Sequence, residues 1–334
     1  MHSKLIRPPV LKMGDKVALI APSSPPKHVE RIDFAANYLR TLGFDVAEGK
    51  SLRNVRGYLA GTDDARAFDV NHAFANPDIK GIFCLRGGYG ASRILDKIDY
   101  ANIRKNPKFF CGYSDTTALH IAINQISGVM TFHTPAVGDA AFPTAALSMS
   151  KEEKNAASRP NHSAFFSSKM KWKERDEYTQ ADMNKYITNE DFSGEILNPH
   201  EAWHFLTTGT AAGLLCGGNL AIICATMGTP YEINTHGKII FIEDVNEAPF
   251  RIDRMLHQLK LAGKFDVCTG VVFGDFANCE GGNGSLTIPE IIADLNLSVP
   301  VLYGLKCGHC MPTASLPLGA MVRLCSTENS FTIL

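Results

Sequence analysis

The 334-residue sequence carries almost no net charge, because 33 Lys and Arg side chains oppose 34 Asp and Glu side chains, a formal charge of −1. The lack of a basic surplus excludes nucleic acids and anionic membranes as electrostatic partners. Long uninterrupted apolar runs are also lacking, since the longest, at 211–228, contains glycines and Asn219. That run predicts a buried strand and helix rather than a membrane span.

The N-terminal segment lacks the apolar stretch and small-residue cleavage site of a secretory signal peptide. The nine cysteines are an odd number, and most lie inside apolar runs, where a free cysteine packs as a small hydrophobe. These features predict a reduced, cytoplasmic protein. Hydrophobic residues make up 45% of the chain and charged residues 20%, a balance that can fill the core of one large or two smaller domains.

Strand and helix patterns alternate over residues 1–143. Near-continuous apolar segments such as KVALIAP and IKGIFCL have the length of strands, and helix-like periodicity follows each of them. Strands that are apolar throughout are buried on both faces, which is typical of a parallel sheet covered by helices. The pattern resumes at 205–334, so we expect an α/β protein with an N-terminal and a C-terminal domain.

Residues 144–204 interrupt this alternation. The segment is polar, mixed in charge and has little periodicity, which predicts a linker or surface excursion. A functional lid is the alternative, since long loops in compact proteins tend to be functional.

Two short motifs resemble metal or redox sites. HEAWH, at 200–204, fits a zinc-protease pattern, but residues 205–231 contain no Asp, Glu or His as a third ligand. CGHC, at 307–310, has the spacing of a redox pair, but Pro312 and Pro317 disfavour the helix start that activates a thiolate. Neither motif therefore predicts a metal or a redox function.

A glycine-rich turn, GGYGASR at 87–93, follows a predicted strand. It imitates a dinucleotide fingerprint, but Arg93 stands where a small glycine is needed for helix packing, so we expect no nucleotide cofactor. Such a turn can still present backbone N–H groups to an oxyanion.

The segment KFFCGYSDTTALH places Ser114 where an apolar strand ends and a helix pattern begins. Gly112 gives room for a tight turn. A serine at this point projects its hydroxyl over the sheet edge, and the N–H of Asp115 points toward the same space, as in a nucleophile elbow. A simple helix-capping role for Ser114 is equally consistent with the pattern.

A nucleophilic serine needs a base, and the base needs an orienting group. The strand KIIFIEDV delivers Glu243 near its carboxyl end, where ligand chemistry gathers in α/β sheets. His309 lies in a loop after a later strand and is a candidate base. His120 and His133 are closer in sequence to Ser114 and remain competitors.

Seven stretches together resemble the LD-carboxypeptidase family, serine peptidases of the S66 type, over nearly the whole chain. They are GDKVALIAPSS, GYLAGTDDARAFDVNHAFANPDIKGIFCLRGGYGASRILDKIDY, NPKFFCGYSDTTALH, TFHTP, LCGGNLAIICATMGTPYEI, GKIIFIEDVNEAPFRIDRMLHQL and GHCMPTASLPLG. The resemblance implies a Rossmann-like N-terminal domain that carries the nucleophile. It also implies a C-terminal domain that carries the base and acid, with the active site between the two.

The resemblance implies a triad of Ser114 as nucleophile, His309 as general base and Glu243 as its orienting acid. Backbone N–H groups of Asp115 and Gly88 would form the oxyanion hole. The implied enzyme is a homodimer without metal or cofactor, and it binds no nucleic acid or membrane. Its implied substrate is a muropeptide: it removes the terminal D-alanine from the L,D-linked tetrapeptide of cytoplasmic cell-wall fragments.

Three further residues concern the substrate. Arg86, in the glycine-rich turn, is our hypothesis for a group that holds a substrate carboxylate, with a structural ion pair as the alternative. Thr134 stands where family members usually carry glycine. A related branch of the family, the microcin immunity proteins, hydrolyses peptidyl- or aminoacyl-nucleotides and stacks the base on an aromatic loop residue. Trp172 lies in the corresponding polar segment, whereas EAPFRIDRML favours the carboxypeptidases.

Overall fold

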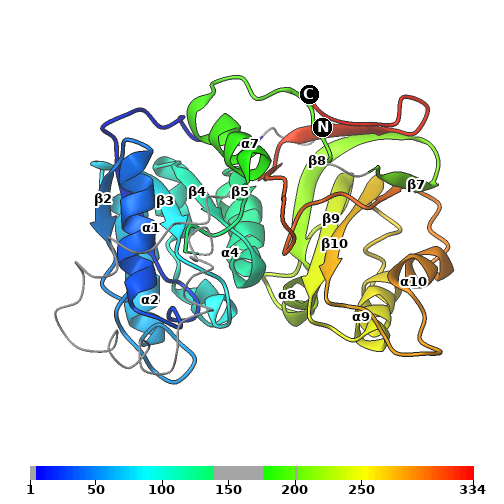
Figure 1. Ribbon diagram of the computed structural model, residues 1–334, viewed down its shortest axis with the longest axis horizontal. Coiled ribbons are helices and arrows are strands. Elements are labelled where there is room, and N and C mark those ends of the chain that lie inside the picture. Colours follow the sequence, from blue (N-terminus) through cyan, green and yellow to red (C-terminus); the bar gives the residue numbers. More distant parts are fainter. Residues whose placement is uncertain (1–4, 139–175, 200–201) are drawn as a thin grey trace.

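The computed structural model describes residues 5–138, 176–199 and 202–334. Trp172 and the first two residues of HEAWH therefore lie outside the described residues. Two β-sheets stand side by side, each flanked by helices, with helix α7 at the top of the junction between them (Figure 1). This arrangement confirms the expected α/β fold class.

The N-terminal sheet is parallel except at one edge. Its strand order is β12-β5-β4-β3-β1-β2, and β12 is the strand that runs antiparallel to its neighbour β5. The strands are β1 (Lys16–Ile20), β2 (Asp45–Glu48), β3 (Ile79–Cys84), β4 (Phe109–Gly112), β5 (Thr131–His133) and β12 (Leu316–Leu318). The accompanying helices are α1 (Glu30–Thr41), α2 (Asp63–Ala75), the 3-10 helices η1 (Ala91–Lys97) and η2 (Ser114–Thr116), α3 (Tyr100–Lys105), α4 (Thr117–Ala122) and the π-helical turn η3 (Ile123–Ser127).

The C-terminal sheet has a parallel centre and antiparallel flanks. Its order is β6-β14-β13-β8-β9-β10-β11-β7, with β8 to β11 parallel. The strands are β6 (Gly194–Glu195), β7 (His204–Thr207), β8 (Thr210–Asn219), β9 (Lys238–Val245), β10 (Gly270–Ala277), β11 (Val301–Tyr303), β13 (Met321–Cys325) and β14 (Ser330–Ile333). The helices are α7 (Glu177–Thr188), α8 (Leu220–Ala225), α9 (Pro249–Leu261) and α10 (Ile288–Asp294).

Helix starts follow local capping chemistry. The Thr62 side chain accepts a hydrogen bond from the amide of Ala65 and caps α2. Thr287 and Glu290 form a reciprocal capping box at the start of α10, and Pro249 occupies the first turn of α9. A cap of this kind stabilises a helix by about 1 kcal/mol.

The segment 144–204, expected to be a linker or surface excursion, contains a packed helix. Residues 177–188 form α7, whose Met183, Tyr186 and Ile187 are buried in the main hydrophobic core. Residues 177–188 are therefore not a surface excursion. The sequence pattern did not indicate this helix, because its apolar face is narrow and lies between polar residues. The domain boundaries at 143 and 205 stay a prediction.

Asp182 of α7 provides a test of how the helix is buried. Burial raises the pKa of the Asp182 carboxyl to about 6, while the amide of Ser315, which donates to it, works in the opposite direction. The titratable groups that face it are Lys185, Tyr178, Tyr186 and Cys307. The pKa of Asp182 in the folded protein lies above the ordinary value of 3.8, so the fold favours the protonated carboxyl. This contribution to the free energy of unfolding is complete below pH 4 and is lost as pH rises through 6.

The Asp182→Asn variant cannot ionise at this position. Relative to the wild type, its free energy of unfolding should therefore rise between pH 4 and pH 7, by up to about 3 kcal/mol. Urea unfolding of both proteins across this pH range measures the difference. A difference that does not change with pH would show that the Asp182 carboxyl is not desolvated.

The two halves of the molecule meet in a shared core. Phe132 of β5 and Phe241 of β9 belong to the same hydrophobic cluster. The amide of Asn219, at the end of β8, donates to the Thr117 hydroxyl at the start of α4, at 3.1 Å. This junction brings the end of β8, the neighbour of β9, against the start of the helix that follows β4.

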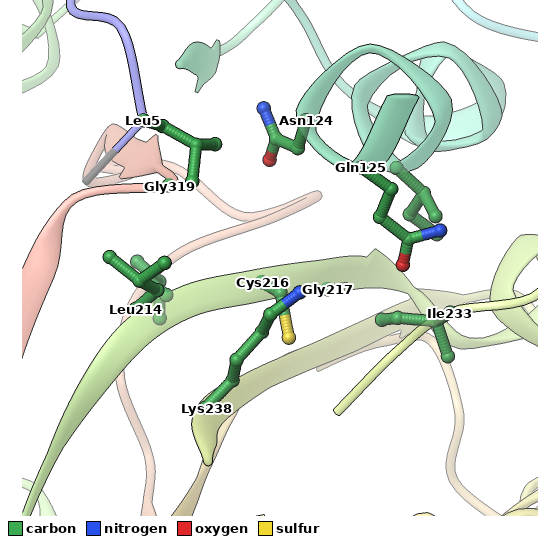
Figure 2. Close-up of a pocket in the computed structure, with 11 residues that line it drawn as sticks. Leu5, Asn124, Gln125, Leu214, Cys216, Gly217, Ile233, Lys238 and Gly319 are labelled. Atoms are coloured by element: carbon green, nitrogen blue, oxygen red, sulfur yellow. The ribbon is translucent and has the colours of Figure 1, made fainter. Parts of the chain in front are cut away.

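Figure 2 shows a pocket at another part of the same junction, where η3 meets β8 and β9. The Gln125 side chain points across it and ties the halves together, donating to the Glu232 carbonyl and accepting from the Asn234 amide at 2.6 Å. Its lining residues include none of the predicted site residues. Across the described ranges of the chain, no helix combines the length and apolar character needed to cross a membrane.

Candidate active site

Ser114 stands at a sharp turn between β4 and α4. Its φ of 62° lies in the left-handed region, which is uncommon for a residue other than glycine and is found where a nucleophile elbow is built. Gly112 permits the turn, because a Cβ there would lie 2.9 Å from the Cys84 Cβ. The N-cap residue of α4 is Thr116, so capping does not account for the position of Ser114.

The glycine-rich turn after β3 lies directly against Ser114. A Cβ on Gly87 would lie 2.9 Å from the Ser114 Oγ and 3.2 Å from the Asp115 amide nitrogen, so only glycine allows this approach. The amide of Tyr89 donates to the Ser24 hydroxyl, whereas that of Gly88 donates no hydrogen bond to any part of the chain that the structure describes.

The Asp115 side chain fastens the two turns together. Its carboxylate accepts a 2.7 Å hydrogen bond from the amide of Ala91, and burial raises its pKa although amide donors of the turn counteract this. The fully buried Arg66 donates to the Gly90 carbonyl at 2.7 Å and to that of Pro22. These contacts hold the glycine-rich turn and the Ser114 turn in a fixed relation.

Glu243 and His309 form a buried pair from the C-terminal half. The Nδ1 of His309 lies 2.7 Å from the Oε2 of Glu243, whose side chain is fully buried near the carboxyl end of β9. Gly308 has a φ of +123°, and a Cβ there would lie 2.5 Å from that same carboxylate oxygen. The close approach of the loop to Glu243 therefore requires glycine at this position.

The His309 ring reaches the Ser114 turn through Tyr113. The Tyr113 and His309 ring centroids are 4.6 Å apart with an interplanar angle of 32°, and Tyr113 immediately precedes Ser114. The fold thus brings together residues 113–114, Glu243 and His309 from three separate parts of the chain.

The competing histidines lie in the core. His120 is fully buried with its Nε2 2.9 Å from the Gly112 carbonyl oxygen, and burial lowers its pKa to about 4. His133 is fully buried against Tyr113 and Phe241, and burial lowers its pKa well below the ordinary value. Among the described residues, neither His120 nor His133 pairs with a carboxylate as His309 does.

The structure also describes three other residues that the sequence analysis singled out. The Arg86 guanidinium is half-buried and donates to the Pro25 carbonyl at 3.1 Å. Thr134 is buried, and its amide continues the pairing of β5 by donating to the Gly112 carbonyl. His204 lies on strand β7, not on the helix that a zinc-protease motif requires.

The cysteines beside His309 are poorly suited to thiolate chemistry. Burial raises the pKa of Cys310 to about 12 and that of Cys307 well above its ordinary value. A redox pair needs a thiolate at neutral pH, and these two thiols stay protonated there. Within the described ranges, no group of three or more His, Cys, Asp or Glu side chains is arranged to hold a metal ion.

Comparison with known proteins identifies the family. A family model for the LD-carboxypeptidase N-terminal domain matches residues 17–134, and one for the LD-carboxypeptidase C-terminal domain matches residues 212–324. The chain belongs to the LD-carboxypeptidase family, peptidase family S66. The family assignment and the expectation of an enzyme of this class are thereby confirmed, and the protein is an S66 carboxypeptidase.

Individual relatives cover almost the whole S66 chain. The probable murein peptide carboxypeptidase of Bacillus subtilis (strain 168) is 37% identical over 331 residues, which are 98% of this chain and 94% of the relative. The microcin C7 self-immunity protein MccF of Escherichia coli is 28% identical over 97% of this chain and 93% of its own. The solved structure of muramoyltetrapeptide carboxypeptidase from Oxalobacter formigenes matches with a TM-score of 0.74 and 26% identity, covering 95% of this chain and 97% of that one.

Sequence reasoning missed Tyr113 and Gly308 in this S66 site. Gly308 lies inside the CGHC motif, which was interpreted through the spacing of its two cysteines. Its signal was available, because a glycine next to a candidate base indicates a close backbone approach. Tyr113 gave no local signal, since an aromatic residue at the end of an apolar strand is ordinary.

Proposed function

We propose that this S66 carboxypeptidase is a serine peptidase that removes the terminal D-alanine from L,D-linked tetrapeptides of peptidoglycan fragments. The observation that carries the proposal is the 2.7 Å His309–Glu243 pair beside the left-handed turn at Ser114. The similarity to the murein peptide carboxypeptidase of Bacillus subtilis supports the choice of substrate.

The proposed mechanism is acyl transfer through Ser114. As the Ser114 Oγ attacks the carbonyl carbon of the diaminopimelate–D-alanine bond, the Nε2 of His309 takes the hydroxyl proton. The C–N bond then breaks, and His309 returns the proton to the amino group of the departing D-alanine. Water, activated by the same histidine, releases the acyl group from the serine.

Electrostatics accounts for the other roles. In its ionised form, Glu243 keeps the proton of the neutral imidazole on Nδ1 and stabilises the imidazolium that forms during attack. The backbone N–H groups of Asp115 and Gly88 stabilise the tetrahedral oxyanion, and one such donor is worth about 3 kcal/mol in the transition state. Both donors belong to turns that Asp115 fastens together, so no reorganisation is needed during the reaction.

Mass spectrometry of disaccharide tetrapeptide after incubation with the enzyme tests the proposed reaction. We expect the loss of one alanine residue from the peptide. An intact peptide after prolonged incubation with a folded enzyme would contradict the proposal.

Arg86 is proposed to bind the terminal carboxylate of the substrate. The Arg86→Ala variant should raise KM for the tetrapeptide about 10-fold while kcat changes little, because the lost hydrogen bond to a charged group acts on binding. Steady-state kinetics on the disaccharide tetrapeptide measures both constants. Arg93→Ala is the matched control, since Arg93 is half-exposed and paired with Asp63 at 2.7 Å. An unchanged KM for Arg86→Ala would exclude Arg86 as a substrate-binding group and would leave it the structural role of its hydrogen bond to the Pro25 carbonyl.

Hydrolysis of peptidyl- or aminoacyl-nucleotides is the second candidate function. It is favoured by the similarity to the microcin C7 self-immunity protein over 97% of this chain. The same triad would act on it, so substrate preference decides between the two. Release of a nucleotide from a peptidyl-nucleotide, with disaccharide tetrapeptide left intact, would select this alternative.

We further propose that the enzyme acts as a homodimer in the cytoplasm, as the family resemblance implies. Light scattering measures the mass of the particle in solution. We expect twice the 36.4 kDa of one chain.

A further inference from the structure

We propose that helix α7 positions the histidine base, with Thr179 and Asp182 as positioning residues that hold the loop carrying His309. The inference rests on the proposed function, in which the His309 imidazole must stay within reach of Ser114. It assigns a task to a segment that the sequence pattern indicates only as a connector.

The loop around His309, residues 304–315, belongs to no helix or strand. Its first residues are tied to β10, because the Leu305 amide donates to the Phe273 carbonyl and the Asp275 amide donates to the Cys307 carbonyl. A base that must hold its position to within a fraction of an ångström requires other restraints.

Two side chains of α7 supply such restraints. The amide of Thr313 donates to the Thr179 hydroxyl at 2.9 Å, and the amide of Ser315 donates to an Asp182 carboxylate oxygen at 2.6 Å. Thr179, Thr313 and Ser315 are buried, so water does not compete for these bonds. A buried amide that loses its acceptor costs about 1–3 kcal/mol, which makes the loop sensitive to both side chains.

Thr313 connects Thr179 to the residue that precedes His309. Its hydroxyl oxygen lies 3.2 Å from the Gly308 amide, which donates to it, and 3.3 Å from the Gly308 carbonyl oxygen. Gly308 immediately precedes His309 and is the residue that packs against Glu243. A continuous path of hydrogen bonds thus joins α7 to the backbone of the proposed base.

Helix α7 is itself a firm support. Asp176 caps its first turn, accepting from both the amide and the hydroxyl of Thr179 at 2.9 and 2.7 Å. With its proton donated to Asp176, the Thr179 hydroxyl presents a lone pair to Thr313. Farther along, Tyr186 is buried in the core and the Ile187 carbonyl accepts from the Leu11 amide.

The test compares isosteric changes at two threonines of α7. Thr179→Val removes the acceptor for Thr313, and Thr179→Ser retains it. Thr188→Val is the matched control, because Thr188 is exposed and the bonds of its hydroxyl to described residues stay at its own end of the helix, with the Asn184 carbonyl and the Asn189 side chain. The readouts are kcat and KM on disaccharide tetrapeptide and the NMR titration of the His309 imidazole.

We expect Thr179→Val to lower kcat about 10-fold with KM nearly unchanged, and to shift the pKa of His309. Thr179→Ser should restore both, and Thr188→Val should alter neither. Wild-type kcat and an unshifted His309 titration in folded Thr179→Val would overturn the role of α7.

Two further outcomes are informative. Should Thr179→Val fail to fold, Asp182→Ala and Asp182→Asn replace it, since alanine removes the acceptor for Ser315 and the asparagine amide oxygen retains one. Loss of kcat in the alanine variant alone supports the inference, and equal kcat in both variants contradicts it. If the wild type releases no alanine, the proposed function fails, and the His309 titration still decides whether α7 positions the ring.

Discussion

Replacing Ser114 with alanine should lower kcat for D-alanine release by about 10⁴-fold or more. The variant lacks the oxygen that forms the acyl-enzyme, while the glycine-rich turn and the Glu243–His309 pair stay in place. Substrate affinity should therefore remain close to that of the wild type. Alanine has a further benefit as a probe, because its side chain is smaller than that of serine and cannot collide with Gly87.

Mass spectrometry of the released alanine and calorimetric titration of the tetrapeptide measure turnover and binding separately. Ser92→Ala is a suitable control, since Ser92 belongs to η1, after the last glycine of the turn, and should leave both quantities unchanged. Turnover by Ser114→Ala at the wild-type rate would exclude Ser114 as the nucleophile. If neither protein turns over substrate and both bind it equally, the chain is a muropeptide-binding protein without catalysis.

Replacing Glu243 with glutamine should lower kcat by about 10³- to 10⁴-fold. The glutamine amide can donate to the Nδ1 of His309, which places the imidazole proton on Nε2. An Nε2 that already carries a proton cannot accept the proton of Ser114. The variant also lacks the negative charge that stabilises the imidazolium. The shape and volume of the side chain hardly change, so the loss of kcat reports the effect of the imidazole tautomer and of the missing charge.

Asp244→Asn provides the matched control for this change. Asp244 is the next residue of β9, and its carboxylate accepts from the Asn219 side chain at 3.1 Å and the Ala221 amide at 2.9 Å. Since consecutive residues of a strand point to opposite faces, this carboxyl belongs to the β8–α8 turn instead of the His309 pair. We expect its kcat to stay within about threefold of wild type, and a Glu243→Gln variant equally active would remove Glu243 from the mechanism.

Local patterns were sufficient for much of the fold. Strands β1, β3, β4 and β9 appear as apolar runs because both faces of a parallel sheet are buried. The turn at Ser114 was predictable because a strand, a glycine and a helix start follow one another within a few residues. Glu243 could be placed at a strand end by the same local reasoning. The catalytic roles of these residues stay predictions.

The amino-acid sequence by itself determined the α/β class, the parallel strands at the centre of the sheets and the family. The tertiary structure decided what the local patterns left open: His309 pairs with Glu243, as the family resemblance implies, while His120 and His133 lie in the core, and α7 packs against the His309 loop. The reason is physical: periodicity reports which side of its own strand or helix a residue occupies, whereas these contacts join residues 66 and 134 positions apart. Which distant side chains meet depends on how the sheets are joined, and no local pattern carries that information.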